Sequence, residues 1–305
     1  MKRIIIKFFI YTSALIGIHI FAAYQADGHF DSYYLRFTNG QHQSMILGTS
    51  RAAQGLNPAV IDSILGDYSP IGNFAFANVS SPYGQVYFEA ICKKIDTTAT
   101  DKKNIFILAV SPWSISTLDK SDDISKFRER NLFLTKIKSI NKKGKPNFEY
   151  LMKEYAQSWG KILYNPVDNQ AFLHDNGWLE VSVSMNPSEV QKRTSEKVIA
   201  YHTNMSIYQY SPNRMNYLKQ TILFLKKYGS VHLVRLPISE PMGAVENKYM
   251  PDFDTKMNLL SQEHNLKYWS FAPQNANYDY TDGNHLYYKS SLDVSEILAK
   301  WIRNN

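Results

Sequence analysis

Short apolar runs alternate with segments of helical apolar spacing along most of the chain, and this alternation constrains the fold more than any other feature. A strand that is covered on both faces of a parallel sheet is nearly continuously apolar, as these runs are. Alternation of strand and helix predicts an α/β protein whose helices cover both faces of the sheet. We therefore expect a three-layer α/β/α sandwich with a mostly parallel five-stranded sheet.

The predicted elements form a βαβαβ block and an αβαβα block, separated by a stretch in which the alternation stops. The predicted strands are residues 44–47, 71–79, 104–110, 231–236 and 266–271. The predicted helices are residues 59–65, 85–95, 212–228, 252–263 and 290–302. Asn57 and Pro58 are typical of a helix start, with Asn as the cap and Pro in the first turn.

The intervening stretch, at about residues 113–213, is rich in Lys, Asn, Tyr and Ser. We expect it to be a largely helical insertion or lid, with helices around Ile124–Ile140 and Phe148–Ile162. Its aromatic residues favour a folded platform over a disordered linker, although ordinary packing would explain most of these rings. Residues 28–305 are accordingly expected to form one domain that carries this insertion.

The N-terminus is the most apolar part of the chain. After Lys2 and Arg3, residues Ile4–Ala23 are mostly apolar, and as a helix they would reach about 30 Å, the thickness of a bilayer core. Basic residues before this run and acidic residues after it predict a single-pass helix with a cytoplasmic N-terminus and an extracytoplasmic domain. A cleaved signal peptide, which would leave the domain secreted or periplasmic, is the alternative. Residues 1–27 are thus a membrane anchor or a signal peptide.

Composition and charge argue against several classes of function. The 305 residues are 44 % hydrophobic, which is ample for a packed core. A net charge of +7 without a long Lys/Arg run gives little support to a nucleic-acid partner. The single cysteine, Cys92, excludes an internal disulfide and a cysteine-rich zinc site. The histidines lack metal-ligand spacing and there is no phosphate-binding Gly motif, so we expect no metal and no cofactor.

Two short segments near opposite ends of the chain carry a potential catalytic set. The first predicted strand stops at Gly48 and delivers Ser50 onto a turn, at the sheet edge where open α/β sheets bind ligands. A serine nucleophile needs a base within hydrogen-bond reach, and Asp282-Gly283-Asn284-His285 supplies a histidine and a carboxylate. Each segment alone could be an ordinary turn, since Ser caps helices and Asp-Gly is a common turn dipeptide. Catalysis is favoured because the alternative requires two unrelated turns to present the residue types of a catalytic set by chance.

The order of these segments resembles the blocks of the SGNH (GDSL-like) hydrolases over about residues 44–303. The matching positions are Gly48-Thr49-Ser50, Asn78 with Gly84, and Asp282-x-x-His285. The resemblance implies a flavodoxin-like fold. It also implies that Ser50 is the nucleophile, that His285 is the general base, and that Asp282 orients the imidazole.

The resemblance further implies an oxyanion hole made by the backbone at Ser50, by Gly84 and by an Asn after the third strand. That Asn is missing, because the usual Gly-x-Asn-Asp stretch is replaced by Val110-Ser111-Pro112-Trp113-Ser114. Only Ser111 or Ser114 could replace it, and we expect Ser111. Removing one such donor costs about a hundred- to a thousandfold in rate. The side chains expected to contact substrate are those of Arg51, Asn78 and Trp113, with a structural salt bridge as the alternative for Arg51.

The N-terminal anchor and outward-facing domain are similar to those of membrane-anchored bacterial SGNH-like proteins that modify cell-envelope polymers. The resemblance implies an exported serine esterase or O-acyltransferase that acts on acyl groups of an envelope or extracellular polysaccharide. An integral-membrane protein that exports acyl groups is then an expected partner. The alternative is a catalytically weak or inactive SGNH-like protein that binds polysaccharide or scaffolds the assembly of an envelope polymer.

Overall fold

A central parallel sheet organises the computed structural model, which describes residues 1–98, 103–155, 159–163 and 170–305. The sheet has five strands in the order β2-β1-β3-β8-β9, and every neighbouring pair is parallel. Counted along the chain this is the flavodoxin-like order 2-1-3-4-5. The strands are β1 (Ser44–Leu47), β2 (Ile71–Asn73), β3 (Ile105–Ala109), β8 (Ser230–Arg235) and β9 (Lys267–Ser270). The predicted α/β fold with a parallel five-stranded sheet is therefore confirmed.

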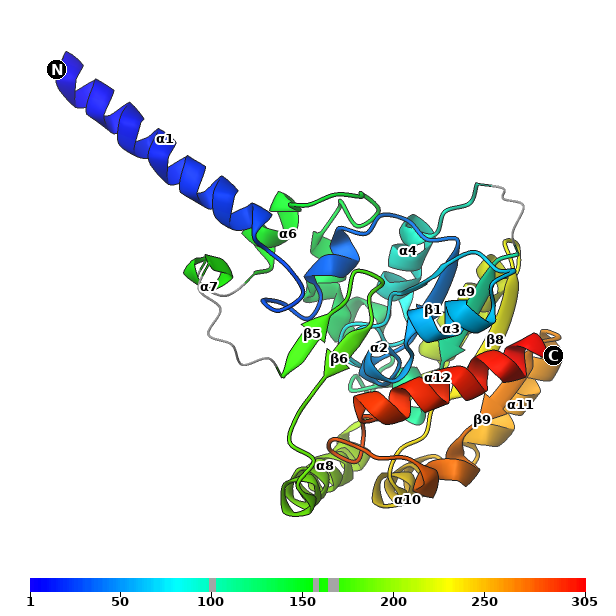
Figure 1. Cartoon of the computed structure of the whole chain (residues 1–305). Coiled ribbons are helices and arrows are strands. Elements are labelled where there is room, and N and C mark those ends of the chain that lie inside the picture. Colours follow the sequence, from blue (N-terminus) through cyan, green and yellow to red (C-terminus); the bar gives the residue numbers. More distant parts are fainter. Residues whose placement is uncertain (99–102, 156–158, 164–169) are drawn as a thin grey trace.

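Helices cover both faces of the sheet (Figure 1). Helix α12 packs against α2 and α3 on one face, while α4 packs against α9 on the other. Helix α11 lies on the α9 side, where Lys219 of α9 pairs with Glu263 of α11 at 2.8 Å. The helices of these two layers are α2 (Ser50–Gly55), α3 (Pro58–Ile64), α12 (Tyr288–Arg303), α4 (Gln85–Lys94), α9 (Pro212–Leu225) and α11 (Phe253–Glu263).

The core lies between these layers and follows from apolar periodicity. All five residues of β3 are buried, as expected for a central strand with helices on both sides. On α12, Val294, Leu298 and Ile302 repeat every four residues and are buried, so one face of this helix packs on the body. Full burial of each such side chain contributes about 1.5–3 kcal/mol. This packing fixes the ends of the strands, where the functional residues emerge.

The second strand is shorter than the predicted 71–79. Strand β2 ends at Asn73, and the backbone N–H groups of Ser80 and Ser81 then donate to the carbonyl of Ala77, which closes a turn. The side chain of Asn73 also donates to the carbonyls of Ala52 and Leu56. The apolar residues after Asn73 are buried because they line a loop that packs on β1, and their burial does not require a strand.

Residues 113–213 depart from the sheet-and-helix alternation, as expected, but their helices differ from the predicted ones. The expected helix around Ile124–Ile140 is a series of short turns. The expected helix around Phe148–Ile162 includes residues 156–158, which lie outside the described residues. Residues 164–169 also lie outside the described residues. Two antiparallel two-stranded sheets, β4-β7 and β5-β6, are also present. The elements are η2 (Pro112–Ile115), β4 (Ser116–Thr117), η3 (Ile124–Lys126), η4 (Arg128–Asn131), α5 (Phe133–Lys136), α6 (Phe148–Lys153), α7 (Gly160–Leu163), β5 (Ala171–Leu173), β6 (Leu179–Val181), α8 (Pro187–Ile207) and β7 (Gln209–Tyr210).

Helix α8 is the longest element of this stretch and was not predicted. Its start carries a standard signal, because Asn186 caps the helix by accepting from the N–H of Ser188 and Pro187 occupies the first turn. No residue of α8 is buried, so its sequence lacks the apolar stripe that usually reveals a helix. Two shorter elements that were also not predicted follow β8 and β9, namely α10 (Glu240–Tyr249) and η5 (Ala272–Asn277).

Helix α1 (Lys2–Tyr24) extends away from the rest of the chain (Figure 1). It has a mean hydropathy of 2.0 over a window that is 0 % buried, and it is long and apolar enough to cross a membrane. Only its end contacts the body, through buried Ala22 and Ala23 and through His19, whose ring lies 5.2 Å from that of Trp159. A short helix, η1 (Tyr34–Phe37), then leads into the sheet. The expected apolar N-terminal helix is therefore present.

Candidate functional site

The end of β1 presents Ser50 at the carboxyl edge of the sheet. Gly48 has a φ of +143°, and a Cβ there would lie 2.9 Å from the Cβ of Ala109 and 3.0 Å from its carbonyl oxygen. Only glycine tolerates this combination of a positive φ and close backbone contact. Thr49 is extended and Ser50 opens α2, where the first N–H groups have no acceptor within the helix. The backbone N–H of Ser50 is thus free to donate outside the helix.

The loop before α12 brings the expected base to this serine. His285 Nε2 lies 2.8 Å from Ser50 Oγ, although the two residues are 235 positions apart in the chain. On the other side of the ring, Nδ1 lies 3.0 Å from Oδ2 of Asp282 and 3.1 Å from Oδ1. The structure therefore brings the three predicted residues, Ser50, His285 and Asp282, into one hydrogen-bonded series.

Asp282 is held rigidly by its own turn. Its Oδ1 accepts from the backbone N–H groups of Asn284 at 3.0 Å and His285 at 2.9 Å. Burial alone would raise the pKa of this carboxyl. The hydrogen bond and charge of His285, together with the Lys197 ammonium, outweigh that effect and hold the pKa of Asp282 well below its usual range. The carboxylate is therefore ionised at neutral pH and accepts hydrogen bonds only.

Buried hydrogen bonds and ion pairs connect the segment of Ser50 to the loop of His285. Arg51 donates through Nε and Nη2 to Oδ1 of Asn284, at 3.0 and 2.7 Å. Its Nη1 pairs with Oε1 of Glu246 at 2.7 Å, and Oε2 of Glu246 accepts from Arg235 at 3.0 Å. We expected Arg51 to contact substrate, with a structural salt bridge as the alternative. In the structure, its buried guanidinium contacts Asn284 and Glu246, as in the alternative. These contacts clamp the segment that carries Ser50 to the loop that carries His285.

The hydrogen bonds from Arg51 also fix the orientation of the Asn284 amide. Because Oδ1 faces two Arg51 donors, Nδ2 faces the opposite side, where it lies 3.2 Å from His285 Nε2. The Nδ2 group is a donor, so in the neutral imidazole it shares the Nε2 acceptor with the hydroxyl of Ser50. Asn284 was not among the predicted site residues, although it stands inside the segment that supplies Asp282 and His285.

Helix α8 lies over this loop. Lys197 Nζ is 3.0 Å from Oδ2 of Asp282, the oxygen that also faces His285. Arg193 Nε donates to the carbonyl of Thr281 at 2.7 Å. A Cβ at Gly283 would lie 2.7 Å from the Thr194 side chain, which shows how closely the helix approaches the loop. Lys197 could not be predicted as a site residue because its helix was not predicted.

An aromatic cluster adjoins the triad. The ring of Trp113 stacks on that of Tyr249 at 4.5 Å and makes edge contacts with Tyr201 at 5.0 Å and Tyr208 at 6.0 Å. Burial raises the pKa of Tyr201, and the charges of Arg51 and Asp282 act on its hydroxyl in opposite directions. Trp113, an expected substrate contact, is buried in this cluster, and its indole N–H has no hydrogen-bond partner among the described residues.

The two other expected oxyanion donors lie in different surroundings. Gly84 leaves room for a buried ion pair, since a Cβ there would lie 2.8 Å from Oε1 of Glu129 and 2.9 Å from Nη1 of Arg214. The N–H of Ser111 donates to Oγ of Ser114 at 2.9 Å, and the N–H of Ser114 donates back to Oγ of Ser111 at 3.3 Å. Both serines are thus engaged with each other. Asn78, the remaining expected substrate contact, lines a cavity beside the aromatic cluster.

Within the described parts of the chain, no group of three or more His, Cys, Asp or Glu side chains is arranged to hold a metal ion. A scan of the sequence against models of protein families and a search among curated proteins found no match. The function must therefore be argued from the site itself.

Proposed function

We propose that this chain is an exported serine esterase or O-acyltransferase of the SGNH type, acting on acyl groups of a cell-envelope or extracellular polysaccharide. The observation that carries the proposal is the 2.8 Å contact between His285 Nε2 and Ser50 Oγ, with Asp282 on the other ring nitrogen. Nucleophile, base and orienting carboxylate are the three parts that an acyl-transfer triad needs. The order of the SGNH-like blocks along the chain supports the choice of family.

In the first half-reaction, Ser50 Oγ attacks the carbonyl carbon of the ester as its proton passes to His285 Nε2. A C–O bond forms to Ser50 and the carbonyl oxygen becomes an oxyanion. When the tetrahedral intermediate collapses, the ester C–O bond breaks and His285 returns the proton to the leaving alcohol. The product is an acyl group on Ser50, while Asp282 stabilises the transient imidazolium.

In the second half-reaction, His285 takes a proton from an incoming hydroxyl, whose oxygen attacks the acyl carbon. The bond between the acyl carbon and Ser50 Oγ then breaks, and His285 returns the proton to Ser50 Oγ. Water as acceptor makes the protein an esterase, and a sugar hydroxyl makes it an acyltransferase. The backbone N–H of Ser50 can donate to the oxyanion.

Helix α1 supports export. A single apolar helix that follows Lys2 and Arg3 would place the N-terminus in the cytoplasm and the domain outside, anchored in the membrane. Cleavage after the helix would instead release a secreted or periplasmic enzyme. For an anchored acyltransferase, an integral-membrane protein that exports acyl groups is the expected partner, because transfer to a sugar hydroxyl requires an acyl donor on the outer side.

A non-catalytic protein that binds polysaccharide or scaffolds polymer assembly is the second candidate. It is favoured by the reciprocal hydrogen bonds between Ser111 and Ser114, which occupy the place where the family has its oxyanion amide. Loss of one donor lowers the rate by about a hundred- to a thousandfold without removing the nucleophile. The two candidates therefore differ in whether Ser50 turns over an ester.

The test is hydrolysis of 4-nitrophenyl acetate by the full chain in detergent, without added metal or cofactor. We expect turnover that Ser50→Ala abolishes. Ser63→Ala is the matched control, because Ser63 is exposed on α3 and its hydroxyl only donates to a carbonyl of its own helix at 2.7 Å. Equal rates for wild type and Ser50→Ala would favour the binding or scaffolding protein.

A further inference from the structure

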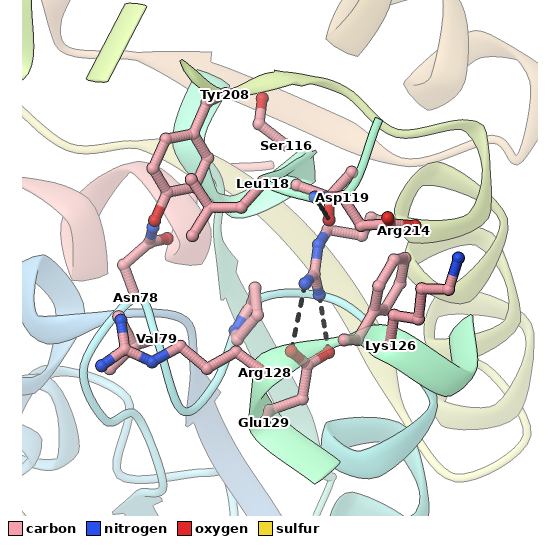
Figure 2. Close-up of a pocket in the computed structure, with 13 residues that line it drawn as sticks. Asn78, Val79, Ser116, Leu118, Asp119, Lys126, Arg128, Glu129, Tyr208 and Arg214 are labelled. Carbon is pink, nitrogen blue, oxygen red and sulfur yellow. Dashed lines mark hydrogen bonds and ion pairs between the residues drawn. The ribbon is translucent and has the colours of Figure 1, made fainter. Parts of the chain in front are cut away.

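A cavity of about 290 Å³ is lined from several elements (Figure 2). The turn after β2 contributes Asn78, and the segment after β4 contributes Asp119. The η3–η4 region contributes Arg128 and Glu129, and Tyr208 follows α8. Figure 2 shows Asn78 and Tyr208 on one side and the Glu129–Arg214 pair on the other. The volume is close to the lower end of the about 300–1,000 Å³ typical of ligand pockets.

Two series of contacts connect this cavity to the segment of Ser50. Ser81, in the same turn as Asn78, donates from Oγ to the carbonyl of Gly48 at 2.7 Å, two residues before Ser50. On the other side, Tyr208 lines the cavity and contacts Trp113, which in turn contacts Tyr201, whose hydroxyl is affected by the charge of Arg51. A ligand in the cavity would therefore contact elements that are connected to the segment of Ser50.

The base of the cavity holds polar atoms that the protein leaves unpaired. Arg214 donates to both carboxylate oxygens of Glu129, at 2.8 and 3.1 Å, and its guanidinium lies 4.2 Å from the ring centroid of Phe127. Arg214 is only 4 % exposed, yet among the described residues its Nε has no acceptor, and the buried Oδ1 of Asn78 has no donor there either. An unpaired buried polar group costs about 1–3 kcal/mol. A hydroxyl group that reaches either atom can pair with it, because a hydroxyl both donates and accepts.

The uncompensated charge at the cavity is positive. Arg128 is exposed and, among the described residues, makes no hydrogen bond or ion pair. The lining side chains carry three cations, Lys126, Arg128 and Arg214, against the two carboxylates of Asp119 and Glu129, and Glu129 pairs with Arg214. Burial raises the pKa of Tyr208, and the positive charge of Arg128 opposes this rise.

We infer that this cavity binds an anionic sugar unit, a hydroxyl-bearing ring that carries a carboxylate or a phosphate. Arg128 pairs with the anionic group, and ring hydroxyls bond to Asn78 and Arg214. The inference rests on the proposed function in identifying this unit as part of the polymer that exchanges acyl groups at Ser50. It adds to that proposal the charge of the polymer and the place where the polymer is held.

The test measures binding of small sugars to the full chain in detergent by ligand-observed NMR titration. Methyl glucuronide, glucose 6-phosphate and neutral methyl glucoside are the probes. We expect an anionic probe to bind at least about tenfold more tightly than the neutral one, as charge-assisted hydrogen bonds imply. The preferred anion identifies the group as carboxylate or phosphate. Equal binding of all three probes, or no binding of any, would overturn the inference.

Variants then assign the binding to this cavity. Arg128→Gln should remove the preference for the anion, and Asn78→Ala should weaken all probes alike. Arg130→Gln is the matched control, because Arg130 is exposed on the same η4 helix but donates to Gln85 at 3.1 Å and does not line the cavity. An anion preference that survives Arg128→Gln would contradict the assignment. Labelling of Ser50 by a serine-directed reagent without sugar binding would overturn only this inference, and sugar binding without labelling would overturn only the enzymatic proposal.

Discussion

Strand β3 and helix α8 both lie close to the segments that carry Ser50 and Asp282, but they are held there in opposite ways. All five residues of β3 are buried, and the strand pairs with β1 and β8. None of the 21 residues of α8 is buried. The frame that positions Ser50 is therefore fixed by the core, whereas the helix that covers Asp282 is held by contacts at its surface.

The contacts of α8 are polar as much as apolar. Its half-buried residues repeat at helical spacing and so form one face toward the body. They are Val190, Arg193, Thr194, Lys197, Val198, Tyr201, Asn204 and Met205. Partly exposed ion pairs contribute only about 0–1 kcal/mol each. Changes in the buried sheet and in the residues that it positions should therefore have large effects on stability or rate, and changes in α8 should have small ones.

The largest effect should come from the carboxylate of the triad. Asp282→Asn removes the charge that stabilises the imidazolium and favours the wrong histidine tautomer, and we expect kcat/KM for an acyl ester to fall by about 10⁴. Asp279→Asn, at an exposed position before the same turn, should change kcat/KM by less than about threefold. A fall below tenfold for Asp282→Asn would show that the triad does not operate.

Stability should separate the two regions next. Ile107→Ala, in the centre of β3, should lower the free energy of unfolding by about 2–5 kcal/mol because it leaves a cavity in the core. Val198→Ala, on the half-buried face of α8, should lower it by less than about 1 kcal/mol. Urea denaturation followed by tryptophan fluorescence measures both. Similar losses would mean that α8 is as firmly packed as the sheet.

A buried histidine in β8 should make the stability of the body depend on pH. Burial, and then the charge of Lys267, lower the pKa of His232 in β8 to about 4. The unfolded chain takes up this proton near pH 6.5, so stability should be lost as the pH falls from 6.5 to 4, by at most about 1.4 kcal/mol per pH unit. His232→Gln should flatten this slope, whereas His202→Gln, exposed on α8, should leave it. Identical slopes in urea titrations would refute this origin.

The smallest effect should come from the contact between α8 and the triad. Lys197→Met removes the ammonium 3.0 Å from Asp282, in a pair whose lysine is one-third exposed. Such a pair is worth at most about 1 kcal/mol, so kcat/KM should fall by less than about fivefold. Lys192→Met, exposed on the same helix, is the control. A loss above a hundredfold would instead make α8 part of the catalytic frame.

The strands and the core helices could be predicted from the sequence better than helix α8, and the reason is physical. Buried strands and amphipathic helices leave apolar patterns, and β1 begins and ends at the predicted residues, Ser44 and Leu47. Helix α8 has no buried residue and hence no such pattern, although Asn186 and Pro187 signalled its start. The second strand was predicted too long because buried loop residues are apolar for the same reason as strand residues.

The site shows the same division. The proximity of Ser50, His285 and Asp282 could be predicted because their residue types, order and strand-end positions are visible in the sequence. The Arg51–Asn284 contact joins residues 233 positions apart and depends on side-chain packing, which leaves no local signal. Arg51 was therefore assigned to substrate, and Asn284 was not singled out.

The central claim is that Ser50 is an activated nucleophile, and the most direct test is the intact mass of the full chain in detergent after treatment with a serine-directed fluorophosphonate. We expect one adduct on the wild-type protein, located at Ser50 and absent from Ser50→Ala and His285→Ala. His202→Ala, at an exposed histidine of α8, should be labelled like wild type. The absence of any adduct on wild type, or equal labelling of Ser50→Ala, would contradict the account.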